Sequence, residues 1–157
     1  RRASEAPVPR VHPAAVVGLG DGGAHCGLIC DAGTPTYLLA HWLRDRRRGA
    51  RLPLEFAVRR QTADTAALYD LGDRGKLAPG LLADVNVIDL DTLALTPPAM
   101  VFDLPASGRR LIQKATGYRA TVKRGAVIFE DGEPTGALPG RLVRGPQARP
   151  SGSPEGR

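Results

Sequence analysis

The sequence predicts an α/β fold that is incomplete within this chain, and three observations carry that prediction. A short apolar run over residues 15–19 leads into a glycine-rich loop and then a helical pattern, the order of one βα unit. After Gly72 the sequence becomes turn-rich and strand-like, which indicates a β-rich portion. One βα unit cannot make a parallel sheet alone, because parallel strands need neighbours and crossover connections.

The composition is that of a globular protein with few aromatic side chains. The chain has 157 residues, of which 42% are hydrophobic, 24% charged and 4% aromatic. This length suffices for one domain with a core, or for part of a larger one. The chain begins at Arg1 and has a single methionine, Met100, which favours a fragment or a processed piece.

The first elements follow from local signals. Residues 1–13 hold three prolines and no periodicity, so we expect a loop or linker. The apolar run at 15–19 predicts a short buried strand. Thr34 and Pro35 have the residue types of a helix N-cap and first turn, and the helix is expected to run to about Arg47.

A second helix is expected from Pro53, with a bend or restart near Asp64. Pro79 and Gly80 match the two central positions of a type II turn. The strand-like segment "ADVNVIDL" follows that turn, and residues 118–133 form two predicted strands joined at Arg124-Gly125 as a hairpin. The chain's end, rich in Pro, Gly, Ser and Arg, is expected to be disordered.

The net charge of +6 has two interpretations. It can indicate an anionic partner such as nucleic acid or a membrane surface, or it can reflect the chain's general richness in Arg. The most basic segment, "RDRRRGAR" at 44–51, contains no aromatic side chain, although single-strand binders interleave aromatic and basic residues. We therefore expect no nucleic-acid partner.

The two cysteines, Cys26 and Cys30, cannot supply a four-ligand zinc site by themselves. Their spacing permits a disulfide without favouring it, and two small buried side chains are the preferred interpretation. Cysteines without a disulfide framework suit a reducing compartment. The apolar run "AAVVGLG" is too short for a membrane span or a signal-peptide core, so we expect a soluble cytoplasmic protein with no membrane partner.

The loop after the first apolar run presents an acid, Asp21, among glycines. An acid at the carboxyl end of a parallel strand lies where α/β barrels place catalysis. Glycines around it allow a metal, a substrate or another loop to approach closely. The other interpretation is that an Asp-Gly pair here is an ordinary surface turn.

Four segments of the sequence resemble the N-acyl-D-amino-acid deacylase (D-aminoacylase) branch of the amidohydrolase superfamily, near its C-terminal end. The resemblance covers nearly all of residues 14–145. The segment "GKLAPGLLADVNVIDLDTL" is typical of the superfamily. More specific to this branch are "DGGAH", "PTYLLAHW" and "DGEPTGALPGRLVRG".

This resemblance implies a metal-dependent (β/α)8 barrel with a small β-sandwich. Residues 14–72 would be the C-terminal portion of the barrel, 73–145 part of the β-sandwich, and 146–157 a disordered tail. The expected activity is hydrolysis of an amide bond in an N-acylated D-amino acid, a small-molecule substrate, with zinc as cofactor. The oligomeric state is left open.

The resemblance also assigns roles to two residues. Asp21 matches the family's aspartate after the eighth barrel strand, which binds or neighbours the metal and carries a proton from the metal-bound water to the departing amine. His25 belongs to the same motif, either as a substrate-binding or supporting residue or as a loop histidine that orders the turn. His41 lies on the predicted helix beside Trp42 and is expected to pack there rather than to take part in the chemistry.

The chain also departs from the family. Its histidines are His12, His25 and His41, and there is no His-x-His pair. The other zinc ligands are therefore expected outside this chain, and the chain alone is expected to be inactive. Two alternatives remain: another amidohydrolase, of the hydantoinase or dihydroorotase type, or a non-catalytic basic module that is the remnant of a barrel.

Overall fold

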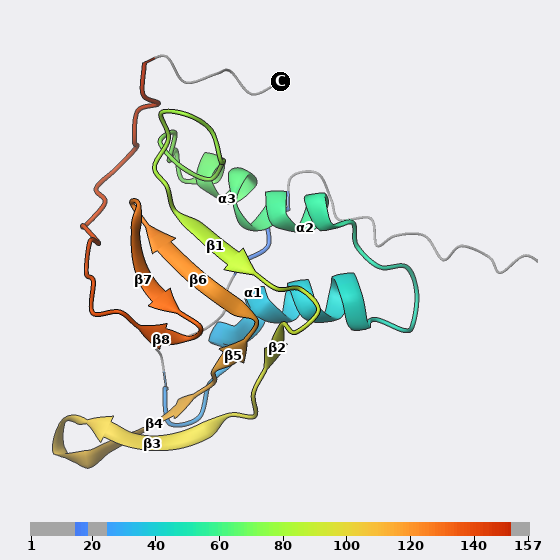
Figure 1. Ribbon diagram of the computed structural model, residues 1–157. Helices are drawn as coiled ribbons and strands as arrows, with labels where there is room; N and C mark the ends of the chain where they lie inside the picture. Colours follow the sequence, from blue (N-terminus) through green and yellow to red (C-terminus); the bar gives the residue numbers. More distant parts are fainter. Residues whose placement is uncertain (1–14, 19–24, 152–157) are drawn as a thin grey trace, which may run out of the picture. The chain divides into compact units, whose positions relative to one another are not determined.

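The computed structural model describes residues 15–18 and 25–151. The chain divides into two compact units, each containing two separate stretches of sequence. The first unit comprises Arg1–Ala57 and Asp89–Gly117, and the second comprises Val58–Ile88 and Tyr118–Arg157. Figure 1 shows the helices and strands of both units, which are described here one at a time.

The helical part of the first unit is one continuous run of three helical forms. A 3-10 turn, η1, spans Asp31–Gly33, α1 spans Thr34–Tyr37 and a π-helix, η2, spans Leu38–Asp45. The run ends two residues before the predicted Arg47. Gly33, and not the predicted Thr34, is the N-cap of α1; Thr34 is its first residue, and the Thr34 hydroxyl donates to the carbonyl oxygen of Asp31 at 2.7 Å.

The strands of the first unit form two separate antiparallel pairs. β2 (Ala94–Leu95) pairs with β5 (Ala115–Thr116), and β3 (Ala99–Leu104) pairs with β4 (Gly108–Ile112) across a short turn, η3 (Pro105–Ser107). Leu93, directly before β2, is completely buried. These short pairs have no strong alternating pattern, and the sequence analysis did not predict them.

Two helices follow the π-helix in the sequence and precede the strands of both units. α2 spans Leu54–Gln61 and α3 spans Ala63–Leu68. The interruption at Thr62 confirms the predicted restart near Asp64. Asp64 lies in the first turn of α3, where its carboxylate accepts from Arg59 at 2.9 Å and from Arg60 at 3.2 Å. An acid in the first turn of a helix is favourable because the N–H groups there are unpaired.

The second unit is built on a four-stranded antiparallel sheet with strand order β1-β6-β7-β8. Figure 1 shows these strands side by side. Their bounds are β1, Val85–Ile88; β6, Tyr118–Lys123; β7, Ala126–Glu130; and β8, Glu133–Pro134. The hairpin predicted at 118–133 is confirmed as β6–β7.

Positive φ angles explain the turns of this sheet. Arg124 and Gly125 have φ of 51° and 82°, as a two-residue turn that follows the strand twist requires. Gly80 has φ of 85°, and the Leu81 N–H donates to the Ala78 carbonyl oxygen at 3.2 Å. This geometry confirms the predicted type II turn.

The strand predicted at 15–19 is not formed over its described residues, 15–18. A β-strand exists only where a neighbouring strand takes its backbone hydrogen bonds, and every sheet in the described ranges is antiparallel and made of residues after 84. Within the tail for which the sequence predicts disorder, Gln147 pairs through its backbone with the segment after α3.

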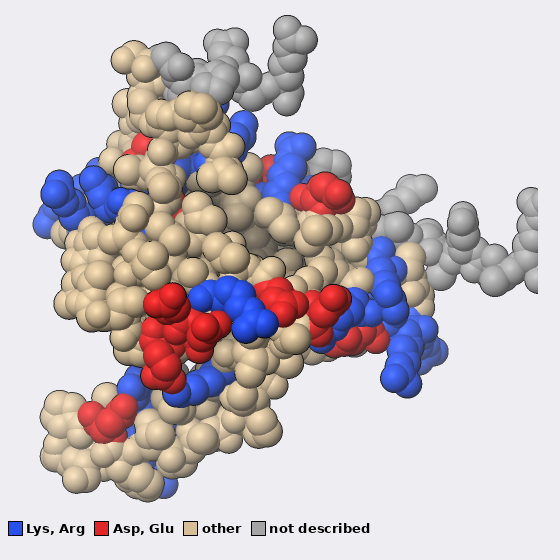
Figure 2. All heavy atoms as spheres, viewed as in Figure 1, with Lys and Arg blue, Asp and Glu red and all other residues tan. Residues whose placement is uncertain are grey.

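Charged side chains of both signs lie close together on the face seen in Figure 2. Ion pairs within each unit include Arg110 with Asp103 in the β3–β4 hairpin and Arg119 with Asp131 in the second unit. In the described part of the chain, no helix has the length and apolar character needed to cross a membrane.

Candidate active site

Of the two site residues predicted from the sequence, Asp21 and His25, the structure describes one. Asp21 lies outside the described residues. His25 is the first described residue after it, and it is exposed. The geometry of the site is therefore that of the loop which follows Asp21 and leads to α1.

His25 forms the start of a tight turn. Its φ of 46° lies in the left-handed region, which costs energy for a residue other than glycine and marks a position held by its surroundings. Its carbonyl oxygen accepts hydrogen bonds from the N–H groups of Leu28 at 2.7 Å and Ile29 at 3.0 Å. The backbone of His25 thus orders the turn, while its imidazole remains accessible.

The turn is attached to β4 in the same unit. The Leu111 N–H donates to the carbonyl oxygen of Cys26 at 2.6 Å. A Cβ atom added to Gly27 would lie 3.6 Å from Nε of Arg109, an ordinary contact distance. This attachment holds the loop that carries His25 on the β3–β4 hairpin.

The end of the loop next to α1 lies at Gly33, which packs closely against two side chains. A Cβ atom on Gly33 would come within 2.7 Å of Gln113 Oε1 and 2.9 Å of Leu95 Cδ2, so a larger residue would force these side chains to move. Gln113 also donates from Nε2 to the Thr96 carbonyl oxygen at 3.0 Å. Gly33 therefore permits the helical run to start directly against β2.

His41 packs within η2, as the sequence predicts. Its ring stacks on Tyr37 with centroids 4.9 Å apart, and it meets the Trp42 ring edge-on at 5.9 Å. The guanidinium of Arg46 lies over Trp42, 4.2 Å from the ring centroid. This last contact was not predicted, although the i, i+4 spacing of Trp42 and Arg46 was a signal for it.

Arg44 connects η2 to the segment after β1. Its Nη1 donates to the carbonyl oxygens of Leu90 at 2.5 Å and Asp91 at 2.9 Å. Its Nε and Nη2 donate to the Asp45 carboxylate, and this hydrogen bonding lowers the pKa of Asp45. This basic residue of the segment 44–51 thus has a structural role within the first unit.

The described residues do not form a metal site. No three His, Cys, Asp or Glu side chains gather in residues 15–18 and 25–151 in a way that could hold a metal ion. Cys26 and Cys30 are free thiols, both partly buried, so the disulfide that the sequence did not favour is not formed. The described part of the chain therefore lacks a zinc ligand set of its own.

Known proteins with similar sequences include an amidohydrolase family and two deacylating enzymes. Residues 10–129 match the Amidohydrolase family. The chain is 33% identical over 111 residues to a D-aminoacylase of Alcaligenes xylosoxydans xylosoxydans, and this match covers 71% of the chain and 20% of that protein. It is 32% identical over 123 residues to an N-acyl-D-glutamate deacylase of the same organism, covering 78% of the chain and 22% of that protein. The chain thus spans about a fifth of these relatives, and no solved structure matches it.

Proposed function

The chain belongs to the amidohydrolase family, and we propose that it is the C-terminal segment of a zinc-dependent enzyme that hydrolyses the amide bond of N-acyl-D-amino acids. The observation that supports this proposal is the similarity to two relatives whose names both describe removal of an acyl group from a D-configured compound. The matched family region includes the loop with Asp21 and His25. The proposed substrate is therefore a small molecule, and the proposed location of the enzyme is the cytoplasm.

We propose that two successive portions of the chain form two different parts of the family fold. Residues 14–72 contribute to a (β/α)8 barrel and residues 73–145 to a small β-sandwich. The strand missing at residues 15–18 would form when neighbouring barrel strands pair with it, since parallel strands need partners on the sheet. The antiparallel β1-β6-β7-β8 sheet is suited to the β-sandwich portion.

Asp21 is the proposed proton carrier of the reaction. Water attacks the amide carbonyl carbon, the carbon–nitrogen bond breaks, and the products are a carboxylic acid and an amine. The Asp21 carboxylate takes a proton from the attacking water and gives it to the departing nitrogen, so that the carboxylate is regenerated. His25, held by its turn with an accessible ring, is proposed to contact the substrate.

Zinc would polarise the amide carbonyl and activate the attacking water. Because the described residues gather no ligand set for it, we place the remaining ligands outside this chain. Asp21 is the only metal ligand proposed here. The chain alone is accordingly proposed to be inactive.

The experiment is a substrate comparison with the full-length protein that carries this chain. N-acetyl-D-leucine and N-acetyl-D-glutamate are assayed for amine release, beside N-acetyl-L-leucine, a hydantoin and dihydroorotate. We expect hydrolysis of at least one D-configured substrate and a preference of at least tenfold over its L-enantiomer. Hydrolysis of the hydantoin or dihydroorotate in place of the N-acyl-D-amino acids would contradict the proposal and favour the other amidohydrolase types.

The non-catalytic alternative has its own test. A barrel remnant predicts that none of the five compounds is hydrolysed and that the coding sequence upstream has an in-frame start directly before Arg1. An active enzyme predicts an upstream His-x-His after a strand, which supplies zinc ligands that this chain lacks.

A further inference from the structure

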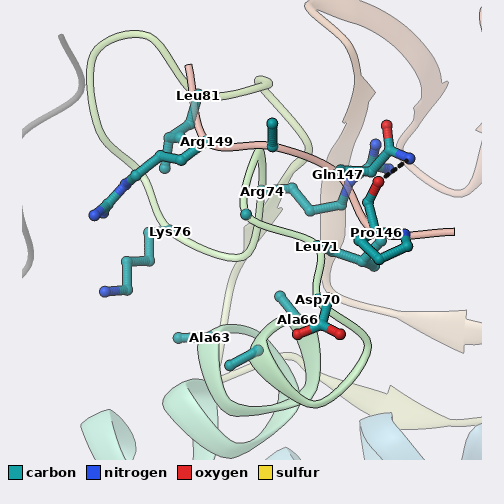
Figure 3. A pocket seen from close by; sticks show the side chains of 13 residues that line it. Ala63, Ala66, Asp70, Leu71, Arg74, Lys76, Leu81, Pro146, Gln147 and Arg149 are labelled. Atoms are coloured by element: carbon teal, nitrogen blue, oxygen red, sulfur yellow. Dashed lines mark hydrogen bonds between the residues drawn. The ribbon is translucent and has the colours of Figure 1, made fainter. Parts of the chain in front are cut away.

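The second unit contains a cavity of about 680 Å³ that the proposed reaction does not use. It is formed by α3, the loop that follows α3, and residues 146–149 of the C-terminal segment. Figure 3 shows the α3 side of the cavity, with Ala63 and Ala66, and the C-terminal segment across from it. The loop with Asp21 and His25 belongs to the other unit.

The C-terminal segment is bound to the end of α3 through backbone hydrogen bonds. The Gly72 N–H donates to the Gln147 carbonyl oxygen at 2.9 Å, and the Gln147 N–H donates to the Asp70 carbonyl oxygen at 2.8 Å. Leu71 and Gln147 form a parallel bridge. These bonds keep Arg149, two residues further on, at the cavity.

Two glycines allow this close approach. A Cβ atom on Gly72 would lie 2.8 Å from the Gln147 carbonyl oxygen and 3.1 Å from the Arg149 nitrogen, both backbone atoms that cannot swing aside. Gly75 has φ of 84°, and a Cβ atom there would lie 2.5 Å from the Cβ of Ala66. The approach of the C-terminal segment at Gly72 and the packing of Gly75 on α3 therefore both require a residue without a side chain.

The charges at the cavity are not balanced by the protein. Arg74 is occupied, because it forms ion pairs with Asp73 at 2.8 Å and Asp84 at 3.5 Å. Within the described ranges, Lys76 and Arg149 have no acidic side chain within ion-pair distance, and Figure 3 shows both extending to the same side. Among the described residues Asp70 is the single acid that lines the cavity, so the lining carries two unpaired cations and one unpaired acid.

We propose that this cavity binds a small carboxylate carried on an aliphatic body. One net positive charge suits a monoanion, and a carboxylate accepts charge-assisted hydrogen bonds from both an ammonium and a guanidinium group. The alanine side chains of α3, with Leu71, Leu81 and Pro146, provide an apolar wall for the body. A simple acyl acid would use Lys76 and Arg149, and an amino acid would in addition place its ammonium group near Asp70.

The test is photo-crosslinking in the full-length protein, which reports where a ligand binds. A diazirine analogue of hexanoic acid is irradiated with the protein, and labelled peptides are mapped by mass spectrometry. Labelling is expected at residues 63–82 and 146–149. The K76Q/R149Q variant should reduce it at least tenfold, and the R141Q/R144Q variant, which removes the same charge from exposed positions outside the cavity, should leave it within twofold.

Competition then distinguishes the two sources of carboxylate. Stronger competition by hexanoate supports an acyl acid, and stronger competition by L-leucine supports an amino acid. The proposal is overturned if these peptides are not labelled, if K76Q/R149Q labels like the unaltered protein, or if the matching diazirine alcohol labels equally well. Stronger competition by inorganic phosphate than by either carboxylate also overturns it.

Discussion

At the residue scale, Asp84 joins three parts of the second unit. Its carboxylate accepts from Lys123 Nζ at 2.5 Å and from the Arg124 N–H at 2.9 Å, and it pairs with Arg74 at 3.5 Å. Burial acts to raise the pKa of Asp84, but the hydrogen bonds from Lys123 and Arg124 and the neighbouring positive charges outweigh it and hold this pKa below its usual value. Asp84 thus connects β1 to the β6–β7 turn.

Replacing Asp84 with Asn should weaken β1 and β6. The side chain is 22% exposed, so loss of its charge leaves Lys123 without its ion-pair partner in a partly buried place and leaves Arg74 paired with Asp73 alone. We expect a loss of about 1.5–3 kcal/mol in the free energy of opening, the range for hydrogen bonds to charged groups. Amide hydrogen exchange of β1 and β6 in the full-length protein measures it.

Asp131→Asn is the matched control, because Asp131 pairs with Arg119 in the same sheet but is 68% exposed. Its effect should be much smaller, since exposed ion pairs contribute little.

The pH dependence of the Asp84 contribution to stability has a definite sign. Because the folded pKa of Asp84 is lowered, its contribution is complete above the unfolded value of about 3.9 and is lost as the pH falls through the folded pKa. Equal amide exchange rates in the Asp84→Asn and Asp131→Asn variants would contradict the structural role of Asp84.

At the element scale, the turns between strands were predictable and the pairings of the short strands were not. Pro79-Gly80 and Arg124-Gly125 are local signals, because their φ angles depend on the residues themselves. β2 and β5 are two residues each and pair across 20 positions of sequence, so nothing local indicates their register. The helical run ends at Asp45, within two residues of the expected end near Arg47, but its π-helical form over Leu38–Asp45 was not predicted.

Two glycines with nearly the same φ give a prediction at this scale. Gly117, between β5 and β6, has φ of 88°, and a Cβ atom there would lie 2.6 Å from Cα of the buried Leu93. Gly125 has φ of 82° and nothing within 4 Å of that position. Gly125→Ala should cost about 1–2 kcal/mol, the strain of a left-handed residue. Gly117→Ala should cost clearly more, because backbone must also move.

Thermal unfolding and soluble yield of the two full-length variants measure this difference. The expected result is a modest drop in melting temperature for Gly125→Ala and a much larger drop, or insoluble protein, for Gly117→Ala. Similar melting temperatures would show that the region around Leu93 can adapt, and the packing described for the first unit would be wrong there.

At the scale of the whole molecule, the described residues leave many large apolar side chains exposed. The large side chains that remain mostly exposed include Leu28 at 80%, Phe102 at 67%, Leu77 at 87% and Leu138 at 94%. Exposed apolar groups and unpaired strand edges are hazards for aggregation. The relatives are about five times longer than the stretch matched here, so further chain is available in them to cover such groups.

The isolated 157-residue chain should therefore aggregate or unfold without a sharp transition. Circular dichroism during heating, combined with light scattering, tests this. A monomer with one cooperative transition above about 45 °C, the lower end for ordinary domains, would show that the chain is self-sufficient. That result would favour the independent, non-catalytic module over the enzyme segment.

At the candidate site the role of Asp21 stays a prediction, because Asp21 lies outside the described residues. What the structure adds is the turn at His25, whose carbonyl oxygen accepts from Leu28 and Ile29, in line with the interpretation of His25 as a loop histidine that orders the turn. The cavity beside α3 gave no sequence signal, because Lys76 and Arg149 are 73 positions apart and line the same cavity through the backbone pairing of Gln147. Contacts of this kind depend on the tertiary fold and not on local pattern.

The role of Asp21 is tested most directly by the Asp21→Asn variant of the full-length protein. Asn has nearly the same size and cannot accept and deliver the proton, so we expect the fold and the substrate KM to change little. The rate of N-acyl-D-amino-acid hydrolysis should fall by about 10²–10⁴, the usual range for general acid–base catalysis. Zinc content and circular dichroism of the variant are measured beside the rate. A correctly folded Asp21→Asn variant with activity within threefold of the unaltered enzyme would contradict the account.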